Sequence, residues 1–138
     1  MNQFILDTSV AAAWYLPEVF AEPARVWQSS MLDARIQLIV PSLHFWEFAN
    51  VLRTHVRDRT LDTELASEIW TLHLDAPLQV LEPPAESVLR LSLEYQATAY
   101  DAVYIALAIH LDIPLLTAER SSTPWVKKLA KRVQTIGG

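Results

Sequence analysis

The sequence predicts an α/β fold with a mainly parallel sheet that helices cover on both faces. Two observations predict it: short apolar runs alternate along the chain with longer segments of helical character, and eight prolines are scattered as breaks between segments. Short strands alternating with helices are typical of such sheets. With 138 residues, of which 51% are hydrophobic, residues 1–138 are expected to form one domain.

The expected strands are short apolar runs. The first run, QFIL at residues 3–6, ends at Asp7, and the run QLIV at residues 37–40 ends at Pro41. The full set of expected strands is residues 3–6, 37–40, 78–81, 114–117 and 133–136.

The expected helices begin or end at residues that favour a helix boundary. Pro17 stops the first helix, and Ser42 and Asp62 are suited to N-cap two later ones. Pro84 fits the first turn of another helix, and Thr98 opens a strongly apolar one. The full set of expected helices is residues 8–16, 24–31, 42–56, 62–74, 84–95, 98–111 and 123–130.

Glycine and cysteine usage excludes several kinds of site. The glycines are Gly137 and Gly138, so residues 1–136 cannot form a Rossmann fingerprint, a P-loop or a GxSxG nucleophile elbow. The absence of cysteine removes disulfides, thiolate nucleophiles and cysteine-ligated metal sites. The N-terminus lacks a signal-peptide pattern, and no segment has the ~18 apolar residues of a membrane span, so we expect a cytoplasmic protein.

Charge is unevenly distributed along the chain. The net charge of −5 argues against nucleic-acid binding through bulk electrostatics, yet residues 120–138 hold five basic side chains and no acidic one. These are Arg120, Lys127, Lys128, Lys131 and Arg132. The tail is either a solvated terminal helix or a surface that holds a nucleic-acid backbone, and its composition leaves both open.

Four carboxylates stand in apolar surroundings: Asp7, Glu47, Asp101 and Glu119. Asp7 and Glu119 follow expected strands, so both belong at the edge where the carboxyl ends of parallel strands meet and ligands bind. Glu47 lies in the middle of an expected helix between two aromatic residues, where a charge needs a partner. That partner is a cation, His44 or a nearby arginine.

The other three acids also have structural explanations. Asp7 fits the N-cap of the helix that follows it, and Asp101 has the spacing of a capping-box partner to Thr98. Glu119 fits an exposed turn beside Arg120.

Convergence of the four acids favours a metal site over separate structural roles. Carboxylates a few ångströms apart raise one another's pKa unless a cation lies between them. Oxygen ligands, without cysteine or an H-x-x-x-H spacing, select Mg²⁺ or Mn²⁺ over zinc. The histidines are expected to be structural or on the surface: His44, His55, His73 and His110.

A divalent cation held by carboxylates suits hydrolysis of a phosphodiester. The cation activates a water and neutralises the charge that builds on the phosphate, so no protein nucleophile is needed. Basic residues outside the acidic pocket would hold the nucleic-acid backbone. The candidates are Arg53, Arg57, Arg120, Lys127 and Lys128.

Four segments, taken in order, resemble the PIN-domain family. They are LDTSV at residues 6–10, PSLHFWEFANVLR at 41–53, TAYDAVYIALA at 98–108 and LLTAER at 115–120. The E-x-x-N-V-L and Y-D-A-x-Y-x-A-L-A patterns make the ordered set specific, and the resemblance covers essentially the whole chain. More narrowly, the length and motif order are similar to the VapC toxins of type II toxin–antitoxin pairs.

The resemblance implies a three-layer α/β/α sandwich and a Mg²⁺- or Mn²⁺-dependent endoribonuclease. It also implies a homodimer, and a cognate antitoxin whose C-terminal segment occupies or crosses the active-site groove. Carried over by position, Asp7 and Asp101 are the principal metal ligands, and Glu47 completes the acidic centre.

The resemblance also assigns supporting residues. Thr8 or Ser9 matches the small hydroxyl residue that supports the first aspartate, Thr117 matches the hydroxyl before the last acid, and Asn50 belongs to the E-x-x-N pattern. Glu119 stands where the family usually has aspartate, and its additional methylene moves the carboxylate by ~1.5 Å. Its role is therefore direct ligation, action through water, a second metal site or an ion pair with the neighbouring arginine.

Two other functions remain open from the sequence. One is a catalytically silent interaction module that uses the acidic pocket to dock a partner's basic peptide. The other is a nuclease directed at DNA, because an acidic metal site alone does not distinguish RNA from DNA.

Overall fold

The structure, a computed structural model, describes residues 2–136 and contains the expected parallel sheet. Five strands lie in the order β3-β2-β1-β4-β5, and each neighbouring pair runs parallel. Their bounds are β1 Asn2–Leu6, β2 Ile36–Val40, β3 Leu78–Val80, β4 Leu115–Thr117 and β5 Val133–Thr135. Each expected strand is present, and its bounds differ from the prediction by one residue at one end.

Helices connect these strands and alternate with them as the sequence predicts. Within residues 2–136 their bounds are α1 Thr8–Ala12, α2 Ala21–Leu32, α3 Leu43–Arg57, α4 Thr63–Leu74, α5 Ala85–Tyr95, α6 Ala99–Leu111 and α7 Pro124–Leu129, followed by the 3₁₀ turn η1 Ala130–Arg132. The helices expected at residues 62–74, 84–95 and 98–111 are confirmed to within one residue at the N-terminal end.

The first helix is shorter than predicted. The expected helix over residues 8–16 ends at Ala12, and the chain continues to Leu16 in tight turns, with the Trp14 N–H donating to the Ala11 carbonyl at 3.0 Å. The indole N–H of Trp14 donates to the carbonyl of Ala24 in α2, also at 3.0 Å. This tertiary contact and the following Pro17 hold the segment in turns, although its composition favours a helix.

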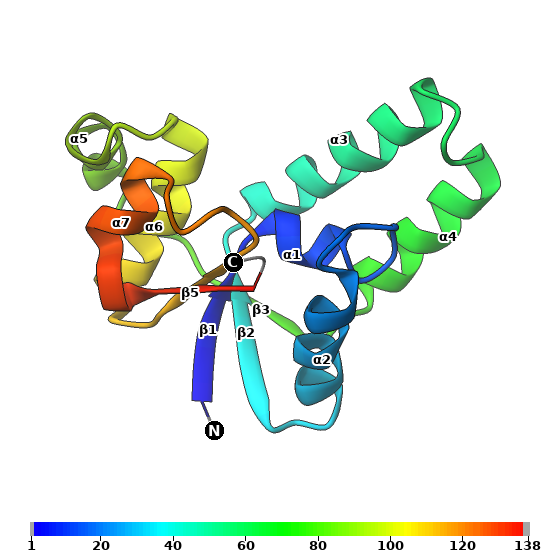
Figure 1. Ribbon diagram of the computed structural model, residues 1–138, viewed down its shortest axis with the longest axis horizontal. Helices are drawn as coiled ribbons and strands as arrows, with labels where there is room; N and C mark the ends of the chain where they lie inside the picture. The colour runs from blue at the N-terminus through cyan, green and yellow to red at the C-terminus, as the bar shows by residue number, and fades with distance from the viewer. Residues whose placement is uncertain (1, 137–138) are drawn as a thin grey trace.

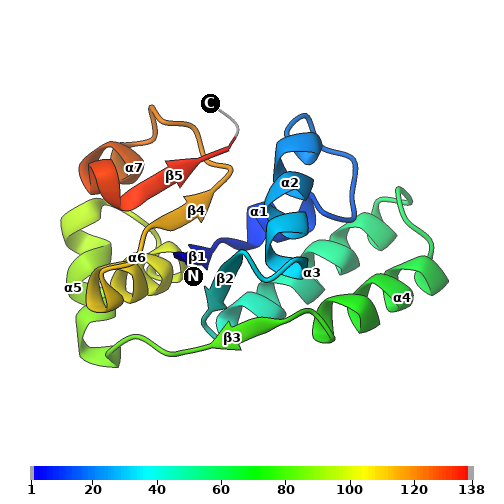
Figure 2. The ribbon, with the colours of Figure 1, turned by 90° about the horizontal axis from the view of Figure 1, so that it is seen from below.

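The sheet lies between two helical layers, as Figure 2 shows. On β1, Ile5 packs into the core with α6 and α7, whereas its neighbour Leu6 packs into the core with α1 to α4. On β4, Leu115 and Leu116 divide in the same way. Because alternate strand residues point to opposite faces, each strand contributes to both cores. The three-layer α/β/α arrangement is confirmed.

Helices α3 and α4 form an antiparallel pair that projects from the sheet (Figure 1). Residues 58–62 join them at the far end, where Asp62 caps α4 by accepting the Leu65 N–H at 2.8 Å. Ser42 stands at the N-cap position of α3, but the expected capping by its side chain is wrong, because that side chain makes no hydrogen bond to the helix. The Ser42 backbone is already helical, and its N–H donates to a carboxylate oxygen of Glu82 at 2.7 Å.

Helix α6 is strongly apolar because it is buried in the core. Its residues 104–108 are almost fully covered by the sheet and neighbouring helices. None of the helices within residues 2–136 combines the length and apolar character needed to cross a bilayer.

The chain reverses direction across the sheet between β1 and β4. From β1 it builds outward through β2 and β3, and then it returns to the other side of β1 to form β4 and β5. Such a reversal opens a crevice at the carboxyl ends of the two central strands, where the flanking connections diverge. Asp7 directly follows β1, and Thr117 ends β4, so both residues lie at this crevice.

The two predicted caps give a matched test of the fold. We expect Asp62→Ala to lower the free energy of unfolding by about 1 kcal/mol, because the side chain that satisfies the Leu65 N–H is lost. Ser42→Ala is expected to change it by less than about 0.5 kcal/mol, because the Ser42 side chain caps nothing. Urea unfolding of both variants measures the difference, and equal losses would contradict it.

Candidate active site

Asp7 is fixed at the end of β1 by both its backbone and its side chain. Its N–H donates to the carbonyl of Leu116 at 3.0 Å, which extends the β1–β4 ladder by one residue. Its carboxylate oxygen Oδ2 accepts a hydrogen bond from the Thr117 hydroxyl at 2.7 Å. The side chain does not cap α1, so the capping interpretation of Asp7 is wrong.

The surroundings of Asp7 disfavour its charge. Burial, together with the charges of Asp101 and Glu47, raises the pKa of Asp7 from 3.8 to about 6, against hydrogen bonds from Thr117 and Ser9 that lower it. The pKa responds to both other acids because all three lie within electrostatic reach of one another. The structure therefore brings together the three carboxylates that the sequence proposes as one centre.

Glu47 reaches the site from α3 and is held by two hydroxyl groups. Its oxygen Oε1 accepts hydrogen bonds from the Tyr104 hydroxyl at 2.6 Å and from the Thr8 hydroxyl at 3.1 Å. The alternative pairing of Glu47 with His44 or an arginine is therefore wrong. Thr8 supports Glu47 and not Asp7, because its hydroxyl points toward α3 and α6.

Asp101 enters from the first turn of α6. Its backbone N–H donates to the Thr98 hydroxyl at 3.0 Å, which confirms Thr98 as the N-cap. Burial raises the pKa of the half-buried Asp101 side chain, the charges of Glu119 and Glu47 add to this, and a hydrogen bond with Thr98 opposes it. Asp101 thus links Asp7 and Glu47 electrostatically to Glu119.

Glu119 lies at the exposed rim of the site. Its carboxylate accepts a hydrogen bond from the Thr123 hydroxyl at 3.3 Å, and its backbone N–H donates to the Thr117 hydroxyl at 3.1 Å. The ion pair with Arg120 is not formed. Within residues 2–136 the ion pairs are Arg35–Asp33, Arg57–Asp58, Arg90–Glu94 and Arg132–Asp112.

Of the other predicted supporting residues, two form hydrogen bonds with Asp7 and one is exposed on α3. Thr117 joins the two ends of the site, because its hydroxyl donates to Asp7 and accepts from the Glu119 N–H. Ser9 contributes a hydrogen bond to Asp7, and its hydroxyl oxygen accepts the Ala118 N–H at 3.3 Å. Asn50 is exposed on α3, three residues after Glu47, and its role stays a prediction.

Tyr104 is a site residue that the sequence reasoning missed. It is almost fully buried on α6, three residues after Asp101, and this spacing places the two side chains on the same face of the helix. The signal was the second tyrosine of the Y-D-A-x-Y motif, because a buried tyrosine hydroxyl in an apolar helix needs a hydrogen-bond partner.

The donor set fits a hard divalent cation. It consists of carboxylate oxygens, and the charges of neighbouring acids add to burial in raising the pKa values of Asp7 and Asp101. A cation would relieve this repulsion. Among residues 2–136, no group of three or more histidine, aspartate or glutamate side chains is already arranged to hold a metal.

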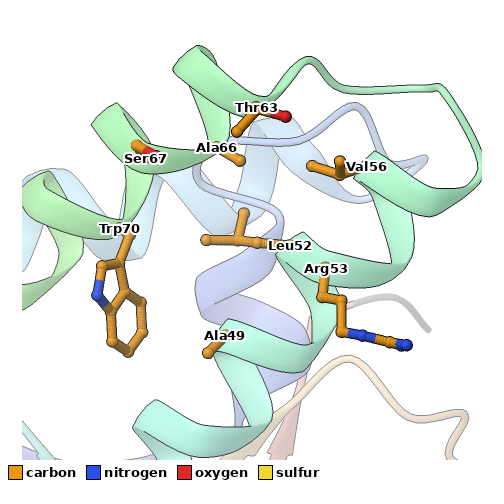
Figure 3. Close-up of a pocket in the computed structure, with 8 residues that line it drawn as sticks. All are labelled: Ala49, Leu52, Arg53, Val56, Thr63, Ala66, Ser67 and Trp70. Atoms are coloured by element: carbon orange, nitrogen blue, oxygen red, sulfur yellow. The ribbon is translucent and has the colours of Figure 1, made fainter.

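The predicted nucleic-acid-binding residues lie in different settings. Arg53 borders an apolar cleft between α3 and α4 and extends away from α4 in Figure 3. The cleft is lined by Ala49, Leu52, Arg53, Val56, Thr63, Ala66, Ser67 and Trp70. It is apolar, unlike the acidic site at the crevice.

Two of the basic side chains are engaged within the protein. Arg57 pairs with Asp58 at 3.1 Å. The Lys128 ammonium donates to the carbonyl of Glu94 at 2.9 Å and lies 5.0 Å from the centre of the Tyr95 ring, so it fastens α7 to α5. Arg120 and Lys127 are exposed.

A model of the PIN domain matches residues 4–121, which is most of the chain. The chain belongs to the PIN-domain family. The matched range of this PIN domain includes all four sequence segments that carry the resemblance, and with them every acid of the site.

This PIN domain is similar to a curated protein and, in its fold, to solved structures. Ribonuclease VapC3 from Pyrobaculum aerophilum is 30% identical over 122 residues, which cover 86% of this chain and 90% of that protein. The crystal structure of PAE2754 from Pyrobaculum aerophilum has a TM-score of 0.75 at 24% identity, covering 98% of this chain and 84% of that one.

Two further solved structures share the fold at lower identity. FitAcB from Neisseria gonorrhoeae has a TM-score of 0.65 at 14% identity and covers 94% of this chain and 95% of that one. VapC20 from Mycobacterium tuberculosis, described as a sarcin-ricin loop cleaving toxin, has a TM-score of 0.62 at 16% identity, with coverages of 86% and 90%.

The raised pKa of Asp7 predicts a dependence of stability on pH. Because folding raises this pKa from 3.8 to about 6, the folded protein holds the proton more tightly, so ionised Asp7 destabilises it above that range. Without metal at neutral pH, Asp7→Asn should be more stable than wild type by up to about 3 kcal/mol. The difference should vanish as the pH falls through about 6 toward about 4.

Chemical unfolding in chelator across this pH range measures the effect. Groups far from Asp7 titrate alike in both proteins and cancel in the difference, whereas Asp101 and Glu47 lose a neighbouring charge in the variant and contribute to it. A variant less stable than wild type at neutral pH would show that the ionised Asp7 carboxylate has a stabilising role.

Proposed function

We propose that this protein is a metal-dependent endoribonuclease that acts as the toxin of a type II toxin–antitoxin pair. The observation that carries the proposal is the electrostatically coupled group of Asp7, Glu47 and Asp101 at the crevice between β1 and β4. Membership of the PIN-domain family and the similarity to a VapC ribonuclease support RNA as the substrate.

The cofactor we propose is Mg²⁺ or Mn²⁺, held by Asp7, Asp101 and Glu47. A divalent cation there would activate a water for attack on the phosphodiester and neutralise charge on the phosphate and leaving oxygen. Glu119, at the rim, would complete the acidic set directly or through a water. The electrostatic coupling between Glu119 and Asp101 supports this placement.

The hydroxyl groups around the acids orient them for this role. Thr117 and Ser9 hold Asp7, which limits the directions in which its carboxylate can turn. The Tyr104 and Thr8 hydrogen bonds to Glu47 both end on Oε1, which leaves Oε2 for a ligand. Such preorganisation of charged groups is what a site for phosphoryl chemistry requires.

The substrate backbone would lie across basic side chains outside the acidic centre. Arg120 is adjacent to Glu119 and exposed, and Lys127 is exposed on α7, so these two are the leading candidates. Arg53 and Arg57 on α3 would extend the contact. Lys128 is the weakest candidate, because its ammonium is already bound to the α5 carbonyl of Glu94.

The partners we propose are RNA, a cognate antitoxin and a second copy of the chain. Helix α5 exposes Leu89 and Leu93, which lie one turn apart on the same face, and Trp46 on α3 is also exposed. Exposed apolar side chains of this kind suit a homodimer. We further propose that residues 1–138 act as one domain in the cytoplasm.

Replacing either principal ligand should abolish cleavage. We expect Asp7→Asn and Asp101→Asn each to lower the cleavage rate by ~100-fold or more, because each removes a charge from the centre. Asp33→Asn is the control, since this acid precedes β2 at the opposite edge of the sheet. Mapping the 5′ ends formed in total cellular RNA measures the effect, and retained cleavage in either variant would overturn the assignment.

Metal binding should stabilise the protein. Mn²⁺ at ~100 times its dissociation constant is expected to raise the free energy of unfolding by about 2.7 kcal/mol in wild type, and chelator should reverse the effect. Asp101→Asn should lose most of this stabilisation. Melting that is indifferent to Mg²⁺ and Mn²⁺ would instead favour a silent interaction module that docks a basic peptide.

Substrate competition distinguishes RNA from DNA. Unlabelled single-stranded DNA should inhibit poorly the cleavage of a labelled RNA substrate by the wild-type protein. Equal competition together with DNA cleavage would favour the DNA-directed nuclease.

A further inference from the structure

Two fully buried histidines face each other between α3 and α4. His44 lies on α3 and His73 near the end of α4, and both have no exposed surface. Their Nε2 atoms are 2.8 Å apart, which is hydrogen-bond distance. At this distance one ring must donate its Nε2 proton, and the other must accept it.

The histidine pair belongs to a longer chain of buried hydrogen bonds. His44 Nδ1 lies 3.1 Å from the hydroxyl of Thr8, which also contacts Glu47 and Tyr104. Across the pair, His73 Nδ1 lies 3.0 Å from the hydroxyl of Tyr15. Hydrogen bonds therefore run from Tyr15, at the partly exposed turn after α1, to the acidic centre.

Counting protons near Glu47 fixes the direction of this chain. The Tyr104 hydroxyl gives its one proton to Glu47 Oε1, at 2.6 Å. With that proton used, the Thr8 hydroxyl must donate to Tyr104 at 2.8 Å or to Glu47 at 3.1 Å, because otherwise the Thr8 and Tyr104 oxygens would face each other with no proton between them. With its proton used, the Thr8 oxygen can only accept from His44.

The remaining links follow from the first. His44 carries its proton on Nδ1 in order to donate to Thr8, so its Nε2 accepts from His73. His73 then carries its proton on Nε2, and its Nδ1 accepts from the Tyr15 hydroxyl. Each proton in the chain is used, and no buried side-chain polar atom within residues 2–136 lacks a partner.

Both rings are neutral in this arrangement. Burial, with a smaller contribution from His73, lowers the pKa of His44 to about 3, and burial lowers the pKa of His73 to about 4. Both tyrosines stay protonated, because burial raises the pKa of Tyr15 to about 12 and also raises that of Tyr104.

Aromatic packing holds the pair in this geometry. The His73 ring stacks on Phe48 with centroids 4.1 Å apart, and the Trp14 ring meets it edge-on at 5.9 Å. Rotation of His73 would break these contacts together with two hydrogen bonds, so the ring is held in one orientation.

We propose that His44 and His73 are positioning residues for Glu47, which act by holding the Thr8 hydroxyl through a hydrogen-bond chain of fixed direction and opposite histidine tautomers. This rests on the proposed function, in which Glu47 helps to hold the cation. The pair extends the site from the crevice into the α3–α4 arm, because His73 comes from α4.

The first test measures the tautomers directly, without metal or RNA. In ¹⁵N-labelled wild-type protein at neutral pH, long-range ¹H–¹⁵N spectra should show a proton on Nδ1 of His44 and on Nε2 of His73. Loss of each signal in His44→Gln and His73→Gln assigns the rings. The opposite pair of tautomers, or a doubly protonated ring, would overturn the proposal.

The second test asks whether the tautomers are coupled to the site. Thr8→Val removes the acceptor of the His44 Nδ1 proton, and Thr8→Ser retains it. Since the rings share one proton between their Nε2 atoms, Thr8→Val should move His44 toward the Nε2 tautomer and His73 toward the Nδ1 tautomer together. Unchanged tautomers in Thr8→Val would overturn the coupling.

The third test separates positioning from structural support. His73→Leu removes the donor to His44 and should weaken Mn²⁺ binding about 10-fold, whereas the amide of His73→Gln can still donate and should restore most of the affinity. Calorimetry at matched folded fractions measures this. Equal affinities in the two variants would overturn the positioning role.

The tests distinguish failure of this inference from failure of the proposed function. Wild-type protein that binds no Mn²⁺, but has the expected tautomers coupled to Thr8, would overturn the proposed metal site and leave the positioning of Glu47 standing. If His73→Leu does not fold, the tautomers of wild type and of Thr8→Val decide the proposal.

Discussion

The constraint on which this structure depends is the partial burial of several carboxylates at the ends of β1 and β4. Burial disfavours the ionised form of Asp7, and the charges of neighbouring acids add to the penalty. Hydroxyl donors, such as that of Thr117, recover part of this cost. The two hydrophobic cores must compensate for the stability that is lost at the crevice. Such a local loss is typical of a site kept for binding and chemistry.

The acidic centre lies where the two helical layers meet above the sheet. Glu47 comes from α3, which packs in one core, and Tyr104 comes from α6, which packs in the other. Their 2.6 Å hydrogen bond therefore joins the layers across the carboxyl edge of the sheet. Because β1 and β4 are neighbours only after the chain crosses the sheet, the site requires the complete topology.

The buried histidine pair extends this arrangement into the α3–α4 arm. An apolar pair of similar size would pack without needing hydrogen-bond partners, whereas His44 and His73 require each ring nitrogen to be satisfied. A satisfied polar chain specifies one arrangement of α3, α4 and the turn after α1. The same groups that fix the arm thereby reach the hydroxyl that contacts Glu47.

The sequence by itself determined the elements and the acids. Apolar runs with polar ends identify strands locally, and a carboxylate such as Glu47 among aromatic residues is conspicuous wherever it packs. Only the tertiary structure decided what depends on distant neighbours. Tyr104 meets Glu47 across 57 positions, and His44 meets His73 across 29, so no local pattern encodes either pair. Likewise, the composition of the segment after Ala12 favours a helix, but its contact with α2 holds it in turns.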